Sequence, residues 1–187
     1  MIPRATHRLA LRNFTESDFA RLHAFASDPE VTRFTSFGPN TPEETKAFLV
    51  RAVLELNGTP RRQYSLAVQL LSDGSLIGSC GLGEPSHAQY EIGYVLAKAH
   101  WGHGLATEVV GSLVQFAFQE LNAKKIWAPV DARNAASCRV LEKAGFQQEG
   151  LLRQDRLKWP EGRDTKVFGL LVDEWVRARP HEPRSSA

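Results

Sequence analysis

The segment that most constrains this chain is a long apolar stretch from Leu105 to Asn122. Its polar side chains recur every three or four residues and so form one narrow stripe on a helix. The stripe consists of Glu108, Ser112, Gln115, Gln119 and Asn122. A helix with so little polar surface has to be covered on nearly every side. We therefore expect this helix to pack deeply against a sheet.

The rest of the sequence supplies the strands for such a sheet. Residues 64–71 and 76–83 are two apolar runs separated by Ser-Asp-Gly-Ser, which is typical of a tight turn and predicts an antiparallel hairpin. Further strands are expected at residues 7–14, 90–96, 125–132, 149–159 and 165–172, and shorter helices at 15–25, 41–57 and 135–144. Strands and helices mix along the chain, which indicates the α/β (α+β) class.

The composition is that of one globular domain. The chain has 187 residues and a formal net charge of only +2, with its arginines spread out, so we expect no nucleic-acid partner. No apolar run reaches the ~18 residues of a membrane span, and the start lacks the pattern of a signal peptide. We therefore expect no membrane association and a cytoplasmic location. Cys80 and Cys138 have no metal spacing and are expected to be small buried residues.

The turn that leads into the long helix, HWGHGLATE at residues 100–108, is the first candidate binding site. Amides at a helix start lack internal partners and lie at the positive end of the helix dipole, so a glycine turn there attracts phosphate. A P-loop needs a lysine and a hydroxyl residue after its last glycine, and a dinucleotide fingerprint needs glycine or alanine where Thr107 stands, so the sequence fits neither. These residues alone are equally compatible with a plain glycine turn.

Two histidines, His100 and His103, stand in the same turn. No third ligand has a suitable spacing, so we expect no metal site. His103 is instead expected to add partial positive charge beside a phosphate.

Two features flank this turn in the sequence. The strand at residues 90–96 places its aromatic and aliphatic side chains on one face, which directs Glu91 to the other. Pro129 cannot donate to a strand ladder, so it is expected at an edge, at a bulge or where two strands part. Both features concern the surroundings of the glycine turn rather than the turn itself.

A resemblance to a known family is carried by several motifs together: YEIGYVL, WGHGLATE, the long helix, IWAPVDARN and NAASCRVLEKAGF. In their order and spacing they resemble the GCN5-related N-acetyltransferase (GNAT) superfamily, and within it the RimJ/RimL-like branch. The resemblance implies the GNAT fold, a mixed, largely antiparallel central sheet with splayed central strands, flanked by helices. It covers one domain at residues 8–175, and residues 176–187 are expected to form a disordered tail.

The resemblance implies acetyl-CoA as the acyl donor, without a metal. Backbone amides of the glycine turn would bind the pyrophosphate, and the free edge of a splayed strand would pair with the pantetheine arm. Asn134, which also suits an ordinary N-cap, would meet the pantetheine, and Ser137 would lie near the sulfur. The implied coenzyme residues are Val95, Leu96, Trp101, Gly102, His103, Gly104, Leu105, Ala106, Thr107, Asn134 and Ser137.

Catalytic roles are predicted for Glu91 and Ser137. Acetyl transfer needs a neutral amine and hence a base in the cleft; Glu91 is the first choice, and Asp155 and Glu84 are the fallbacks. Ser137 is the candidate partner of the departing sulfur, because Leu141 stands where many relatives carry a proton-donating tyrosine.

Other positions depart from the family pattern. Trp101 replaces the usual Gln or Arg at the start of the pyrophosphate signature, and His103 replaces a basic residue. The carboxylate that RimL-like enzymes use as a base falls near Asp155, without a match at Arg156. The oxyanion of the reaction is expected to meet the amide of Val95.

The predicted function is acetyl-CoA-dependent transfer of an acetyl group to a primary amine, either a protein N-terminus or a small amine. The alternatives are a catalytically silent acyl-CoA-binding module and a nucleotide-phosphate binder that uses the same turn. Phe34, Phe37 and Trp159 either wall the acceptor site or belong to the core. A homodimer is a family-level expectation. The acceptor cannot be predicted, because cleft loops are where relatives differ.

Overall fold

The computed structural model describes residues 2–3, 5–58, 60–156 and 162–178, without the side chains of Asn57, Pro85 and Arg156. The elements follow in the order β1 Leu9–Asn13, η1 Glu16–Asp18, α1 Phe19–Ala26, α2 Pro42–Leu54, η2 Glu55–Asn57, β2 Gln63–Leu70, β3 Leu76–Ser86, β4 Gln89–Leu96, η3 Lys98–His100, α3 Leu105–Gln119, β5 Lys125–Asp131, α4 Ala135–Lys143, β6 Gln147–Arg156, β7 Arg163–Leu171 and α5 Val172–Ala178.

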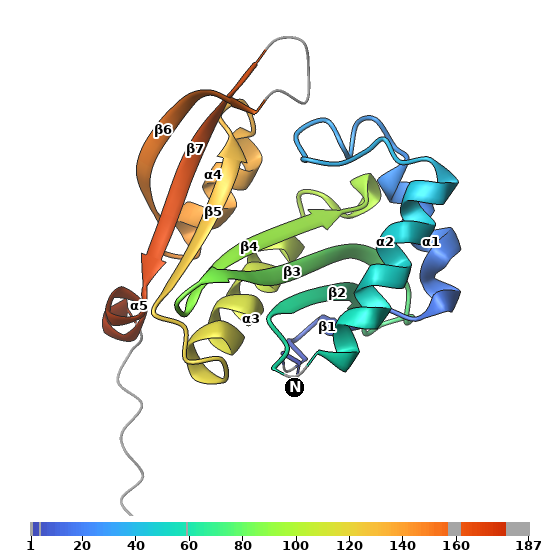
Figure 1. Cartoon of the computed structure of the whole chain (residues 1–187), viewed down its shortest axis with the longest axis horizontal. Helices are drawn as coiled ribbons and strands as arrows, with labels where there is room; N and C mark the ends of the chain where they lie inside the picture. Colours follow the sequence, from blue (N-terminus) through green and yellow to red (C-terminus); the bar gives the residue numbers. More distant parts are fainter. Residues whose placement is uncertain (1, 4, 59, 157–161, 179–187) are drawn as a thin grey trace, which may run out of the picture.

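The strands form one sheet in the order β1-β2-β3-β4-β5-β7-β6, and its only parallel pair in the described part of the chain is β4 with β5. That pair is short: it joins Gln89 to Lys125 and ends where Glu91 meets Trp127. Beyond this point the two strands diverge, and Figure 1 shows the sheet opening into a V. The predicted mixed, largely antiparallel sheet with splayed central strands is confirmed.

Pro129 lies on β5 just beyond the last β4–β5 pair. The Ala132 amide, just after β5, donates to the carbonyl of Asp164 on β7 at 2.9 Å, and the direction of the backbone groups alternates along a strand. Pro129 therefore faces the gap, where its missing N–H costs no ladder bond. Of the three places expected for this proline, an edge, a bulge or a parting of strands, the structure shows the last.

Helices cover both faces of the sheet (Figure 1). One apolar cluster joins α3 and α4 to the strands and includes Val109, Leu113 and Phe168, which are fully buried. A second cluster joins α1 and α2 to the opposite face and includes Leu22, Leu49 and Val95. The expected deep packing of the long helix is confirmed, since every leucine, valine and phenylalanine of α3 is buried.

Helix starts follow the capping residues of the sequence. Thr41 accepts from the Glu44 amide at 3.2 Å, and the Glu44 carboxylate accepts from the Thr41 amide at 2.8 Å, which is a complete capping box.

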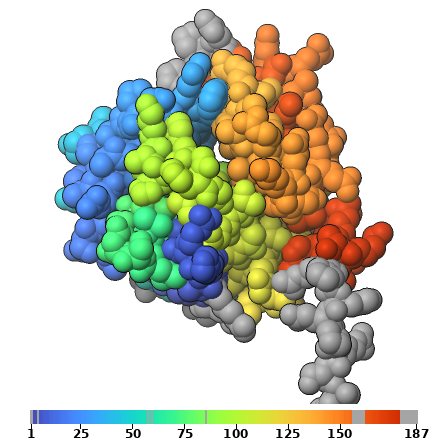
Figure 2. All heavy atoms as spheres, turned by 180° about the vertical axis from the view of Figure 1, so that it is seen from behind, coloured from blue at the N-terminus to red at the C-terminus, as the bar shows by residue number. Residues whose placement is uncertain are grey.

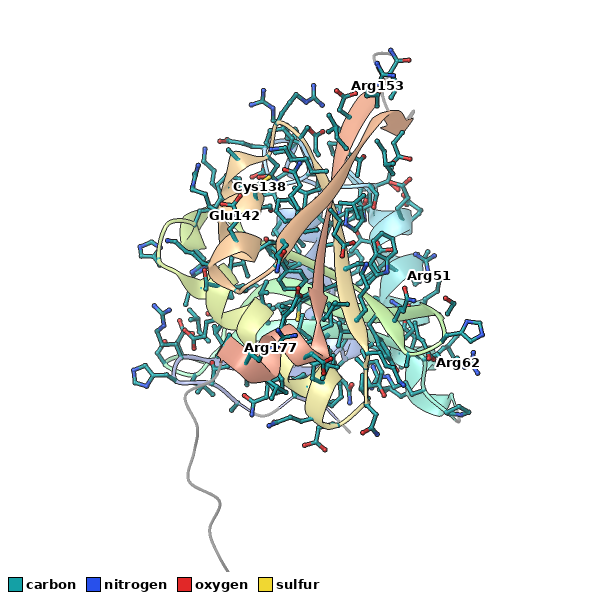
Figure 3. The ribbon with its side chains drawn as sticks, turned by 90° about the vertical axis from the view of Figure 1, so that its left-hand side faces the viewer. Arg51, Arg62, Cys138, Glu142, Arg153 and Arg177 are labelled. Atoms are coloured by element: carbon teal, nitrogen blue, oxygen red, sulfur yellow. The ribbon has the colours of Figure 1, made fainter. Side chains whose placement is uncertain are left out.

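Both cysteines are buried, as predicted, and Figure 3 labels Cys138 on α4. No helix in the described part of the chain is both long and apolar enough to span a membrane.

The end of the domain differs from the sequence-based expectation. Residues 172–178 form α5, so residues 176–178 belong to a helix and not to the expected disordered tail. The reason is a contact that periodicity does not reveal: Trp175 packs on Phe118 of α3, with ring centroids 5.2 Å apart. Figure 3 shows Arg177 on this short helix. The remaining tail residues, 179–187, lie outside the described residues.

Candidate active site

A cavity of about 1260 Å³ runs through the V between β4 and β5. On the side of α3 and α4 it is lined by the glycine turn and by the start of α4. On the other side it is lined by the loop between α1 and α2 and by side chains of β3, β4 and β7. Figure 2 shows the molecule hollowed between the green surface that follows β4 and the orange surface of α4. The two halves meet at the unpaired edge of β4.

The glycine turn at residues 101–104 forms the mouth of the first half. Gly102 and Gly104 have φ values of 79° and 75°, in the left-handed region that favours glycine, and Gly104 is the N-cap of α3. The first amides of α3 therefore have no partners within the helix, and the residues that carry them, Leu105, Ala106 and Thr107, line the cavity. This arrangement suits a pyrophosphate, because it combines free amides with the positive end of a 15-residue helix.

Two side chains hold the turn from outside the cavity. Arg8, just before β1, donates from Nη1 to the His103 carbonyl at 2.9 Å and pairs with Glu108 on α3 at 2.7 Å. Burial favours protonation of Glu108, but hydrogen bonds from Thr6 and Arg8 outweigh it, so its pKa lies below the usual value. His103 is the one predicted coenzyme residue that does not line the cavity. Its contribution is a carbonyl that anchors the turn.

Trp101 takes part in a different contact from the one its position suggested. Its indole Nε1 donates to the Leu96 carbonyl at 2.7 Å, and the side chain is 44% exposed. The turn is thereby fastened to the last residue of β4. The Leu96 carbonyl is occupied by this bond, so pairing with a pantetheine arm would have to use the other groups of the free edge.

The free edge of β4 carries different amides from those predicted. The Ala97 amide donates to the Ile77 carbonyl on the β3 side at 2.8 Å, and alternation turns Val95 the same way. The expectation that the Val95 amide meets the oxyanion is therefore wrong, because that amide faces β3. The amides of Tyr94 and Leu96 face the gap instead and are the candidate oxyanion donors.

The start of α4 forms the opposite wall of this half. Asn134 Oδ1 accepts from the Ser137 amide at 3.1 Å, so the predicted N-cap is confirmed and the side-chain NH₂ is left to meet a ligand. Ser137 is half-buried and lines the cavity, and Leu141, which is buried in the core, also belongs to the cavity wall. Because leucine carries no hydroxyl, position 141 supplies no proton donor.

Tyr94 was not among the predicted site residues. It projects from the free edge of β4 toward α4, and its hydroxyl donates to the Ser137 carbonyl at a long 3.4 Å. Burial raises the pKa of Tyr94 to about 12. The alternation of the strand placed this tyrosine on the aromatic face, but only the fold shows that this face borders the gap beside Ser137.

Glu91 occupies the point where the two halves meet. It is the last β4 residue paired with β5, it is half-buried, and it lines the cavity on the face opposite Tyr94. The fallback Glu84 also lines the cavity, with Arg62 at 3.9 Å. The fallback Asp155 is exposed on β6 and does not line the cavity. Glu91 thus stands where β4 and β5 begin to part.

Phe34 and Phe37 wall the second half of the cavity, and Trp159 lies outside the described residues. Neither phenylalanine belongs to a core cluster, and Phe37 is 38% exposed. The guanidinium of Arg33 lies over the Phe34 ring, 5.2 Å from its centroid. The open choice between core and wall is settled in favour of the wall for these two residues.

A buried ion pair fixes this wall and was missed from the sequence. Arg163 on β7, only 6% exposed, donates from Nη2 to the Arg33 carbonyl at 2.8 Å and lies 3.3 Å from Asp131 on β5. Burial favours protonation of Asp131, but hydrogen bonds from Arg133 and the nearby guanidinium charges outweigh it and lower its pKa. The loop after α1 is therefore tied to β7 across the mouth of the V.

The residues present fit acetyl-CoA as a substrate. Free amides and left-handed glycines stand at one mouth, an unpaired strand edge runs along the middle, and a carboxylate stands at the meeting point. Among the described residues, no three or more His, Cys, Asp or Glu side chains are grouped to hold a metal ion. Fold and site together define an acyltransferase that takes its acyl group from a coenzyme A thioester.

Comparison with known proteins agrees with this class. Residues 8–147 match the family model of the acetyltransferase (GNAT) domain. An N-acetyltransferase named p20 from Bacillus licheniformis is 35% identical over 177 residues, which cover 91% of this chain and 97% of that protein. This chain belongs to the GNAT family of N-acetyltransferases, and acetyl-CoA is its acyl donor.

Solved structures show the same fold. The spermidine N-acetyltransferase of Vibrio cholerae, in complex with CoA and spermine, matches with a TM-score of 0.79 at 21% identity, over 91% of this chain and 99% of that one. The ribosomal L7/L12 α-N-protein acetyltransferase RimL, in complex with coenzyme A, matches with a TM-score of 0.82 at 18% identity, over 93% and 99%. At these identities the match concerns the fold alone.

Proposed function

We propose that this enzyme transfers the acetyl group of acetyl-CoA to the primary amine of a protein N-terminus or of a small molecule. The observation that carries the proposal is the two-sided cavity, which brings the coenzyme half and a phenylalanine-walled half together at Glu91. Relatives of the same fold act on both kinds of acceptor, by their names: RimL on a ribosomal protein and the Vibrio enzyme on spermidine. The tie between Arg163 and Arg33 fixes the acceptor wall.

Each step of the reaction has a candidate group in this chain. Gly102, Gly104 and the first amides of α3 hold the pyrophosphate, and Asn134 meets the pantetheine arm. Glu91 accepts the proton that the ammonium form of the acceptor must lose before its nitrogen can attack the thioester carbon. A gap-facing amide of β4 donates to the oxyanion, without any reorganisation at the moment of reaction.

The proposal is tested by thiol release from acetyl-CoA in the presence of a broad amine panel, with mass spectrometry of the products. The panel contains peptides with free N-termini, amino acids, polyamines and aminoglycosides. We expect release that depends on an added amine and a product heavier by one acetyl group. Tight coenzyme binding without release across the whole panel would contradict the proposal and favour the silent module.

Glu91→Gln tests the assigned base. The substitution keeps the shape and removes the proton acceptor, so we expect kcat to fall about 100-fold, within the range of general-base catalysis. The loss should shrink at high pH, where the amine is already neutral. Full turnover of Glu91→Gln at neutral and lower pH would exclude Glu91, and Glu84→Gln then tests the fallback carboxylate that also lines the cavity.

Three further expectations belong to the proposal. The catalytic domain spans residues 8–175 and continues through the rest of α5 to Ala178, the enzyme acts in the cytoplasm, and it forms a homodimer. Sedimentation of the purified chain tests the oligomeric state, and fractionation of the source cells tests the location.

A further inference from the structure

The departing thiolate has no hydroxyl donor at position 141. Leu141 belongs to the cavity wall there, and its hydrocarbon side chain supplies neither a proton nor a hydrogen bond. Ser137 lines the cavity, but its hydroxyl has to serve from the first turn of a helix where its own amide is already tied to Asn134. The cavity wall facing Ser137 therefore becomes important, and that wall is β4.

Tyr94 is the hydroxyl on that wall. It is the residue of β4 that lies beyond the last β4–β5 pair and projects toward α4, and it lines the cavity. Its hydroxyl reaches across the V to the Ser137 carbonyl, but the distance of 3.4 Å makes this a weak bond. A negatively charged sulfur arriving beside Ser137 would be the stronger acceptor, because bonds to charged partners are about twice as strong as neutral ones.

We propose that the Tyr94 hydroxyl donates a hydrogen bond to the coenzyme sulfur as the thiolate departs. This inference rests on the proposed function. The amine nitrogen forms a bond to the thioester carbon, the carbon–sulfur bond breaks, and its electron pair stays on the sulfur. The Tyr94 hydroxyl turns from the Ser137 carbonyl to that sulfur. The proton lost by the amine finally reaches the sulfur from the cleft, so acetyl-amine and free thiol are the products.

Tyr94 stabilises the thiolate without giving up its own proton. Burial raises the pKa of this phenol to about 12, whereas an alkyl thiol such as that of cysteine has a pKa of about 8.5. The proton therefore stays on the phenol oxygen, and the hydroxyl acts as a permanent donor. The amide of the same residue faces the gap, so the side chain and the backbone of Tyr94 would serve the sulfur and the oxyanion respectively.

The experiment uses the complex of the full chain with coenzyme A, which requires no acceptor. The pKa of the bound thiol is measured by the ultraviolet absorbance of its thiolate during a pH titration, in wild type, Tyr94→Phe and Ser137→Ala. Removing one donor to the thiolate should raise the bound-thiol pKa by about one to two units in Tyr94→Phe. With an accepted amine, kcat of this variant should fall about 10- to 100-fold, the range for one hydrogen bond to a charged group.

Tyr64→Phe is the matched control, because Tyr64 packs on Phe116 in the core and does not line the cavity. It should leave the bound-thiol pKa and kcat unchanged. An unchanged thiol pKa in Tyr94→Phe, a shift confined to Ser137→Ala, or loss of coenzyme binding in Tyr94→Phe would each overturn the proposal. Because the titration needs no acceptor, its result is independent of whether any amine in the panel is acetylated.

Discussion

A substitution of Gly93 should change the stability and the activity of this enzyme in opposite directions. It lies on β4 between Glu91 and Val95, on the acceptor face, and it lines the cavity. A Cβ placed on Gly93 meets no heavy atom within 4 Å, and its φ lies outside the left-handed region. A valine at this position therefore fits the backbone and projects into the space beside the assigned base.

The expected effect on stability is positive. Glycine in a strand interior costs roughly 0.5–1 kcal/mol relative to a residue with a side chain, because it loses more backbone freedom on folding. For a domain of this size about 1 kcal/mol corresponds to roughly 2–4 °C in Tm. Gly93→Val should therefore raise Tm by about 1–4 °C, as measured by thermal unfolding.

The expected effect on catalysis is the opposite. The isopropyl group takes the space through which an amine approaches Glu91, and a displacement of about 1 Å in a reacting group can cost about 100-fold in rate. We therefore expect kcat/KM for the acceptor to fall at least about 100-fold, while calorimetry gives an unchanged Kd for coenzyme A. The control is Gly111→Ala on the exposed side of α3, where a Cβ also meets nothing and only helix propensity improves. Normal acceptor kinetics in Gly93→Val, or a clear drop in its Tm, would refute the reasoning.

Three further predictions concern the glycine turn. Arg8→Gln removes the hydrogen bond from the guanidinium to the His103 carbonyl. Because the Arg8 side chain is 43% exposed, this bond is worth ~1 kcal/mol. In steady-state kinetics, KM for acetyl-CoA should therefore rise about 5-fold with kcat nearly unchanged. Gly104→Ala forces a side chain into the left-handed region at a cost of ~1–2 kcal/mol. Tm should therefore fall in thermal unfolding, and KM for acetyl-CoA should rise. Unchanged values of both would show that the turn does not contribute to coenzyme binding. The lowered pKa of Glu108 means that its stabilisation is present above about pH 4.3 and is lost as the pH falls through its folded value. Tm measured against pH should therefore decline less steeply on the acid side in Glu108→Gln than in wild type.

The parts of the fold that the sequence predicted are those governed by local rules. The capping box at Thr41, the alternation in residues 90–96 and the apolar surface of α3 depend on neighbours a few residues away. The helix α5 was missed because seven residues are too few to show a period, and its anchor Trp175 packs on a residue of α3 far back in the chain. A pattern within the segment carries no information about that contact.

The site shows the same division. The glycine turn and the cap at Asn134 are local and were predicted from composition and spacing. Arg8 meets His103 across 95 positions of sequence and Arg163 meets Arg33 across 130, and nothing in either segment indicates its partner. For the same reason, the sequence suggested a phosphate contact for His103, whereas the folded chain uses its carbonyl as an anchor.

Two residues far apart in the sequence, Pro129 and Trp101, affect the hydrogen-bonding groups that β5 and β4 present to the gap between them. A parallel ladder is built from N–H donors and C=O acceptors of both strands. Pro129 presents no N–H to the gap, and the Leu96 carbonyl on the other edge is taken by the Trp101 indole. Pro129 stands two residues beyond Trp127, the last β5 residue paired with β4, so the ladder lacks an N–H donor at its next step. Leu96 lies nearer the mouth, where the Trp101 indole fastens the glycine turn to the free edge of β4.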